Sequence, residues 1–162
     1  MHLHLRAAAE TDIRDDYAWL TAFMGVAWDH HEVEYAAGIA HSIEKDYRLL
    51  HEMYAECQDA DAWLPVFGGR QPADPPAGGL PHPPLMLMDP AEAGRAAAFL
   101  AAVPFDDLWS RAGARILSSF GPGWSADPDR IRRIFQGHHQ DLRAFYARAA
   151  AAGHAVVKAG WF

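Results

Sequence analysis

The strongest periodic pattern of apolar residues in the chain extends from Ile39 to Tyr54. Its apolar positions are Ile39, Ile43, Tyr47, Leu50 and Tyr54, at intervals of four, four, three and four residues. Such spacing places the side chains on one side of an α-helix with about 3.6 residues per turn. The pattern predicts a helix that begins after an Asp29 cap and runs to about Cys57, with an interruption at Gly38. We expect the rest of the chain to pack against this helix.

Polar and apolar residues alternate in the first segment, residues 2–6. Alternation with a period of two is typical of a β-strand with one face buried. It predicts a short strand with Leu3 and Leu5 in the core and with His2 and His4 on a solvated outer face.

A first helix is expected to follow this strand. Thr11 is a residue type that favours the N-cap of a helix, and Gly25 favours its end. Between them lie apolar residues at helical spacing, namely Ile13, Tyr17, Leu20 and Met24.

Residues 64–84 contain seven of the eleven prolines and four glycines. Proline removes a backbone donor and glycine increases the entropy lost on folding, so we expect a long loop without helix or central strand. Loops of this length are usually functional or mobile. We interpret the chain as one domain, residues 1–162, that carries this loop at 64–84.

The second half of the chain has sharper boundary signals. Leu85–Met88 is an apolar run that predicts a strand, and the Asp-Pro pairs at Asp89 and Asp127 each predict a helix start. The first of these helices is expected to end before Pro104, and a short helix is expected from Asp106. The last helix has an apolar stripe formed by Ile131, Phe135, His138, Leu142, Phe145 and Ala149.

In that last helix, the stripe predicts a buried His138 and a solvated His139. Gly153 is expected to end the helix, and His154–Phe162 to form a final strand. The predicted fold class is therefore α+β, helix-rich, with a small sheet that includes the N- and C-terminal strands.

Composition narrows the classes of partner. The chain is 51% hydrophobic and 22% charged with a net charge of −7, which is typical of a globular protein and unfavourable for nucleic acid or an anionic membrane. No apolar run is long enough to span a membrane. Cys57 is the only cysteine and the first residues do not resemble a signal peptide, so we expect a cytoplasmic protein.

Several segments together resemble the YfbM-like family, a bacterial family of domains of unknown function. They are IEKDYRLLH at 43–51, LPVFGG at 64–69, LMDPAE at 87–92, and LRAFY at 142–146 followed by AA at 149–150 and GHAV at 153–156. The resemblance covers about residues 40–160, with Tyr47 at a position where the family usually has tryptophan. It implies an α+β fold and no established reaction.

Candidate ligand-binding residues lie in the first two of these segments. His51 has a side chain whose ordinary pKa is near neutral, so it suits a general base or a donor to an anion, and Tyr47 lies one turn away. Gly68, Gly69 and Arg70 combine backbone N–H groups with a guanidinium, which suits a carboxylate or phosphate. The alternatives are a structural histidine bonded to a backbone carbonyl and a plain turn.

A second histidine cluster invites comparison with a metal site. His30 or His31 lies one turn from Glu34, but His41 would be about 16 Å from His30 along a continuous helix. Zinc requires ligands about 2 Å from one centre. We therefore expect no metal and no cofactor, and interpret the cluster as solvated and partly capping.

Two functional hypotheses follow. The first is a non-catalytic binding or interaction protein, of accessory or toxin-neutralising type, whose acidic surface suits a basic protein partner. The second is a small-molecule enzyme with His51 as general base and an anion-holding loop at Gly68–Arg70.

Overall fold

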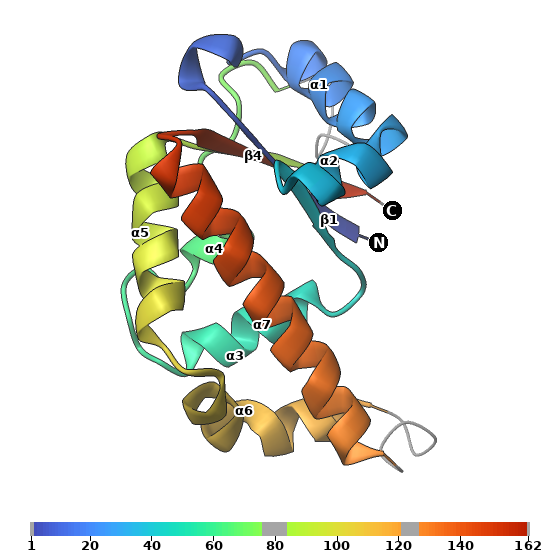
Figure 1. The fold of residues 1–162 in the computed structure, drawn as a ribbon, viewed down its shortest axis with the longest axis vertical. Helices are drawn as coiled ribbons and strands as arrows, with labels where there is room; N and C mark the ends of the chain where they lie inside the picture. Colours follow the sequence, from blue (N-terminus) through green and yellow to red (C-terminus); the bar gives the residue numbers. More distant parts are fainter. Residues whose placement is uncertain (1, 76–83, 121–126, 162) are drawn as a thin grey trace.

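The computed structural model describes residues 2–75, 84–120 and 127–161 (Figure 1). The strands are β1 (His2–Ala8), β2 (Ala40–Ile43), β3 (Leu85–Met88) and β4 (Ala155–Trp161). The α-helices are α1 (Tyr17–Asp29), α2 (His31–Ala37), α3 (Tyr47–Ala55), α4 (Leu64–Phe67), α5 (Pro90–Ala102), α6 (Phe105–Ser119) and α7 (Pro128–Ala151). None of these helices combines the length and apolarity needed to cross a bilayer.

The four strands form one antiparallel sheet in the order β2-β1-β4-β3. The terminal strands β1 and β4 are its central pair, in a register that sets His2 opposite Trp161 and Ala8 opposite Ala155. The predicted α+β fold is confirmed, and so is the predicted sheet that joins both terminal strands.

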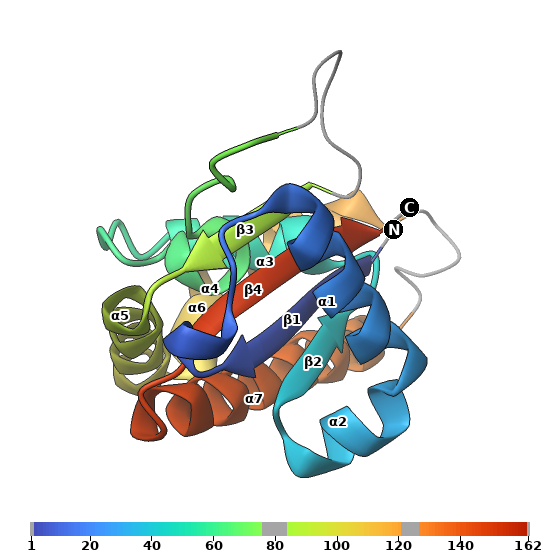
Figure 2. The same cartoon turned by 90° about the horizontal axis from the view of Figure 1, so that it is seen from above.

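Helices cover both faces of the sheet (Figures 1 and 2). On one face, α5 and α7 pack against the strands, and α3, α4 and α6 add their buried side chains to the same large core. On the other face lies α1, with α2 beside it near β2. A smaller core lies beneath α1 and consists of Leu20, Met24, Leu85, Val157 and Ala159.

The predicted outer face of β1 is not solvated. Leu3 and Leu5 are buried as expected, but His4 is also 0% exposed because α1 and α2 cover that side of the strand. The ring of His4 lies 5.8 Å from Trp28 and 5.5 Å from Tyr35. The prediction was wrong because alternation within β1 cannot show that a second helical layer lies on the polar side.

The predicted helix through Ile39–Tyr54 was also wrong in its first part. Gly38 adopts a left-handed conformation with φ of 70° and ends α2, and the next residues form β2 instead. In β2, Ile43 lies opposite Leu3 of β1, so pairing with β1 overrides the helical spacing. Helix resumes only at α3, and Ile39 remains 40% exposed.

The first helix begins and ends later than predicted. Asp16, not Thr11, is the N-cap, and its side chain accepts a hydrogen bond from the backbone N–H of Trp19 at 2.7 Å. Thr11 lies in a short 3-10 helix, Glu10–Asp12. Helix α1 passes through Gly25 without a break, because an isolated glycine costs a helix only about 1 kcal/mol.

Part of the expected loop 64–84 is ordered in regular structure. Helix α4 occupies Leu64–Phe67, which contradicts the prediction that no helix forms there. Residue Arg70 then pairs with Leu87 at the outer edge of β3. The remaining part of the predicted loop, residues 76–83, lies outside the described residues.

The two Asp-Pro helix starts are confirmed. Asp89 and Glu92 form a reciprocal capping box at the start of α5, and Asp127 caps α7 by accepting from the N–H of Arg130 at 2.9 Å. Helix α6 begins at Phe105 and is far longer than the short helix expected from Asp106.

The two histidines of α7 have the opposite burial from that predicted. His139 is 3% exposed, and its Nδ1 atom lies 3.3 Å from the hydroxyl of buried Tyr54. His138 is only half-buried. Both positions lie close to the apolar stripe, and the packing of α6 and α3 decides which of them is covered.

Candidate functional site

Tyr47 and His51 share one neighbour, the side chain of Phe67 at the end of α4. The Phe67 ring meets the Tyr47 ring edge-to-face at 5.9 Å and the His51 ring at 4.8 Å. Tyr47 is 6% exposed and His51 is half-buried. The structure therefore brings together the two α3 residues and the turn that follows α4.

The His51 ring lies in an environment that disfavours its charged form. Burial lowers its pKa, Glu52 raises it and Lys158 lowers it, in that order of size. Its Nδ1 atom is buried and has no hydrogen-bond partner among the described residues. A neutral imidazole with a vacant ring nitrogen is suited to accept a proton or a hydrogen bond.

Lys158 of β4 stabilises the turn next to His51. The side chain is 0% exposed, and its Nζ donates to the carbonyl oxygen of Leu64 at 2.5 Å and to that of Gly68 at 3.0 Å. Burial holds the pKa of this amine well below its usual range. The burial of Lys158 was not predicted, although a lysine inside an otherwise apolar strand was a signal in the sequence.

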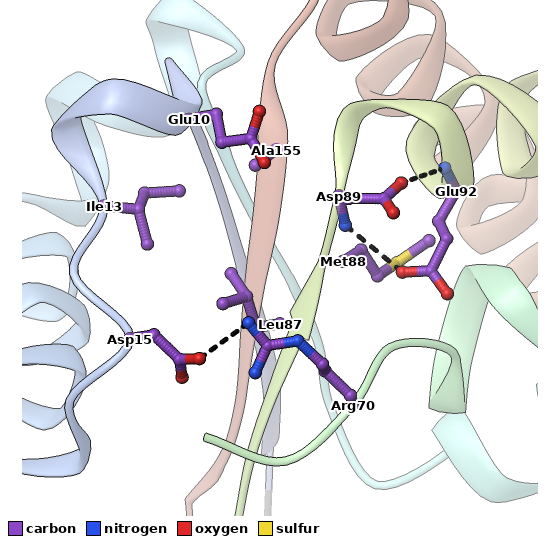
Figure 3. Close-up of a pocket in the computed structure, with 9 residues that line it drawn as sticks. All are labelled: Glu10, Ile13, Asp15, Arg70, Leu87, Met88, Asp89, Glu92 and Ala155. Atoms are coloured by element: carbon purple, nitrogen blue, oxygen red, sulfur yellow. Dashed lines mark hydrogen bonds and ion pairs between the residues drawn. The ribbon is translucent and has the colours of Figure 1, made fainter. Parts of the chain in front are cut away.

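The backbone and the side chain of Arg70 bind partners other than His51. Its backbone N–H donates to the carbonyl of Leu87 at 3.0 Å, and its guanidinium forms an ion pair with Asp15 at 2.7 Å (Figure 3). Gly69 permits this pairing, because its φ is 107° and a Cβ there would lie 2.9 Å from the Leu87 oxygen. Gly68 directly follows Phe67, the ring that contacts His51, whereas the Arg70 side chain lies in a separate pocket.

That pocket, which we call the acidic pocket, has a volume of about 280 Å³. It is lined by Glu10, Ile13, Asp15, Arg70, Leu87, Met88, Asp89, Glu92 and Ala155. Four of these residues are carboxylic acids and one is an arginine, so the lining has a formal charge of −3. In Figure 3 the segment from Glu10 to Asp15 forms one side, and the start of α5 forms the other.

The polar groups of the acidic pocket are held by local structure. Asp15 accepts a hydrogen bond from the backbone N–H of Ala73 at 3.0 Å, and the hydrogen bond from Arg70 lowers the pKa of its carboxyl. Asp89 and Glu92 exchange hydrogen bonds across the first turn of α5, at 2.7 and 3.2 Å. Ile13 and Leu87 are half-buried and add an apolar surface.

The second histidine cluster is divided between different partners. Glu34 is 7% exposed and forms an ion pair with Arg6 at 2.5 Å. The prediction that this cluster is solvated was therefore wrong for Glu34. His31 Nδ1 lies 2.8 Å from the carbonyl oxygen of Trp28. His41 lies on β2 with its ring 6.5 Å from Phe145. Within the described ranges, no group of three His, Cys, Asp or Glu side chains is placed to hold a metal ion.

Comparisons with known proteins identify a family and a similar solved structure. A family model described as a domain of unknown function, DUF1877, matches residues 1–158. The crystal structure of YfbM from Escherichia coli, a protein of unknown function, is similar with a TM-score of 0.60 and 12% identity, over 99% of this chain and 100% of that chain. No curated protein matches the chain significantly. The resemblance to the YfbM-like family is confirmed and extends through the N-terminal residues.

Proposed function

This chain belongs to DUF1877, a family of domains of unknown function, and we propose from its own geometry that it is a non-catalytic binding protein for a basic segment of a partner protein. The observation that carries this proposal is the acidic pocket. Its carboxylates outnumber its single guanidinium, and Asp15 already neutralises that guanidinium.

The pocket suits a lysine or arginine side chain. The aliphatic stem of such a side chain packs on Ile13 and Leu87, while its charged head meets Glu10 and Glu92. Charge on the rim of an interface mainly accelerates association and makes it depend on salt. The net charge of −7 adds to this attraction and disfavours nucleic acid as a partner.

The proposal includes an accessory or toxin-neutralising role in the cytoplasm. Neutralising a basic protein requires an acidic surface of this kind, and a single half-buried cysteine, Cys57, is compatible with a reducing compartment.

Titration with a hexalysine peptide, followed by amide chemical shifts, tests the proposal. We expect shifts in residues 10–15 and 87–92, and binding that weakens as salt rises. Glu10→Lys should lower the affinity by about tenfold or more, because one charge reversal in the pocket replaces attraction by repulsion. Glu32→Lys, an exposed reversal on α2 at the opposite edge of the sheet, is the control with the same change in net charge.

Equal weakening by both variants would show that only net charge matters. Shifts that avoid the acidic pocket would also overturn the proposal.

A second candidate is a small-molecule enzyme with His51 as general base and Tyr47 beside it. The buried Nδ1 atom of His51 without a described partner favours it. Of the predicted anion-holding segment, Gly68 directly follows Phe67, Gly69 lies against Leu87, and Arg70 would have to leave Asp15 to take part. This candidate predicts a bound small molecule in a native mass spectrum of the tag-free protein. The His51→Ala variant should lose that molecule, and the circular dichroism spectrum of the variant should match that of the wild type.

A further inference from the structure

A cavity of about 550 Å³ lies away from both regions described above, between the β2–α3 turn and the helices α6 and α7. Its lining consists of Glu44, Lys45, Asp46, Phe120, Ile134 and His138. It has about twice the volume of the acidic pocket and a different composition, because its lining includes an aromatic ring and a histidine. We call Phe120 and Ile134 its apolar wall.

The polar end of this cavity is formed by His138 and Asp46. Their Nε2 and Oδ2 atoms are 3.8 Å apart, and the side chains are 18% and 24% exposed. This separation exceeds a direct hydrogen bond and allows one ligand nitrogen or oxygen to lie within hydrogen-bond distance of both atoms. The Asp46 side chain makes no capping bond to α3, so the helix does not occupy it.

The apolar wall and the polar end are held by one buried ring. Phe135 is 0% exposed and meets Phe120 edge-to-face at 6.3 Å and His138 edge-to-face at 6.3 Å. Ile134 lies next to Phe135 on α7 and is half-buried. The rings that would contact a ligand are therefore oriented by the core before any ligand arrives.

The charge of the lining restricts the ligand. Glu44 and Asp46 are acidic and Lys45 is basic, which gives a formal charge of −1 with His138 neutral. We propose that this cavity binds a small arylalkylamine, whose ring packs on Phe120 and Ile134 and whose ammonium group is held by Asp46 beside His138. An anionic aromatic ligand would be repelled, and a neutral one would lose the charge-assisted hydrogen bond.

Tryptamine is a suitable probe, added to the full-length protein and followed by the imidazole resonances of His138. His138→Gln identifies those resonances. We expect a dissociation constant of about 1 mM or tighter for a ligand of this size. Its neutral analogue tryptophol should bind more weakly, and indole-3-acetate more weakly still.

Two carboxamide variants separate a specific site from general attraction to an acidic protein. Asp46→Asn should lower the affinity for tryptamine by about tenfold, because it removes a charged hydrogen-bond acceptor. Glu52→Gln removes an exposed carboxylate from the same helix outside the cavity lining and should change affinity by less than about twofold.

The proposal is overturned if about 10 mM tryptamine leaves the His138 resonances unchanged, since that concentration would fill a millimolar site. It is equally overturned if both carboxamide variants weaken binding alike, or if indole-3-acetate binds as tightly as tryptamine. These results are independent of the hexalysine titration, which reports on residues 10–15 and 87–92.

Discussion

The two sides of β1 carry different chemistry, although one strand supplies both. On β1, Leu3 and Leu5 face the large apolar core, while His4 and Arg6 face α1 and α2. Alternation along β1 thus delivers apolar contacts to one helical layer and polar contacts to the other, whereas β3 and β4 give α1 a smaller apolar core. We therefore expect the two helical layers to respond to different perturbations.

Specific polar contacts hold the α1–α2 layer. The Arg6 guanidinium donates to the carbonyl oxygen of Phe23 at 2.7 Å, lies 4.1 Å from the Phe23 ring centroid, and forms an ion pair with Glu34. His4 adds contacts to Trp28 and Tyr35. We expect this layer to depend on pH and charge, and the opposite layer to depend on packing volume.

The largest expected effect is the loss of an aromatic ring from the apolar face. Phe145→Ala should lower the free energy of unfolding by about 3–5 kcal/mol, because Phe145 is 1% exposed and its removal leaves a cavity. Urea denaturation measures the change. Val33→Ala, at a residue that is 73% exposed, is the control and should stay within about 0.5 kcal/mol. A loss below about 1 kcal/mol for Phe145→Ala would mean that the core collapses around the site.

Acidification should act on the other face through His4. Burial, followed by nearby His41 and Arg6, lowers the pKa of His4 from 6.5 to about 4. Between these two values the unfolded chain binds a proton that the folded chain does not, so stability falls as pH drops through this range and levels off below it. The loss from this residue is about 3 kcal/mol.

Urea denaturation at several pH values measures this loss, and His4→Phe should remove its share of it. Some dependence should remain, because burial also lowers the pKa of His41 to about 4. An unchanged pH profile in His4→Phe would contradict the assignment.

Breaking the ion pair should have a somewhat smaller effect. Glu34→Gln leaves the Arg6 guanidinium without its charged partner in a site where the two side chains are 15% and 9% exposed. We expect a loss of about 2 kcal/mol, below the range for fully buried pairs because water still reaches Arg6. Thermal unfolding with and without salt measures it. If the unfolding temperature stayed at the wild-type value, the pair would not hold the layer.

The smallest effect is expected at Lys158, a buried lysine on the apolar face. Lys158→Met loses two hydrogen bonds to backbone carbonyls but also removes a buried amine, so stability at neutral pH should change by only about 1 kcal/mol. The pH dependence is more informative. With the lysine pKa lowered in the folded state, wild-type stability should rise as pH increases toward about 10, and the variant should lack this rise.

Stability curves between neutral pH and about pH 10 would show the difference. A variant that rises as steeply as the wild type would place the titrating group elsewhere.

Local signals in the sequence were sufficient for several elements in the second half of the fold, although not for the length of α6. The Asp-Pro starts of α5 and α7, the apolar run of β3 and the final strand depend on residues that are neighbours along the chain. The capping hydrogen bonds of α5 and α7 span three residues, so no distant segment decides where these two helices begin.

Candidate site residues were predictable only in part. The pairing of Tyr47 with His51 followed from helical spacing, and both do meet Phe67. The separation of Arg70 from His51 could not be predicted from helical spacing, because it depends on which strand edge pairs with the Arg70 backbone. The cavity at His138 was hidden for the same reason, since the β2–α3 turn and α7 meet there from distant parts of the chain.

The sequence by itself determined that this chain forms an α+β fold with joined terminal strands, because caps, breakers and apolar runs act over a few residues. Only the tertiary structure decided that residues 40–43 form a strand, that His4 and Lys158 are buried, and that a second helical layer covers the sheet. These outcomes depend on contacts between residues far apart in the chain, and such contacts override local spacing where they bury a larger surface.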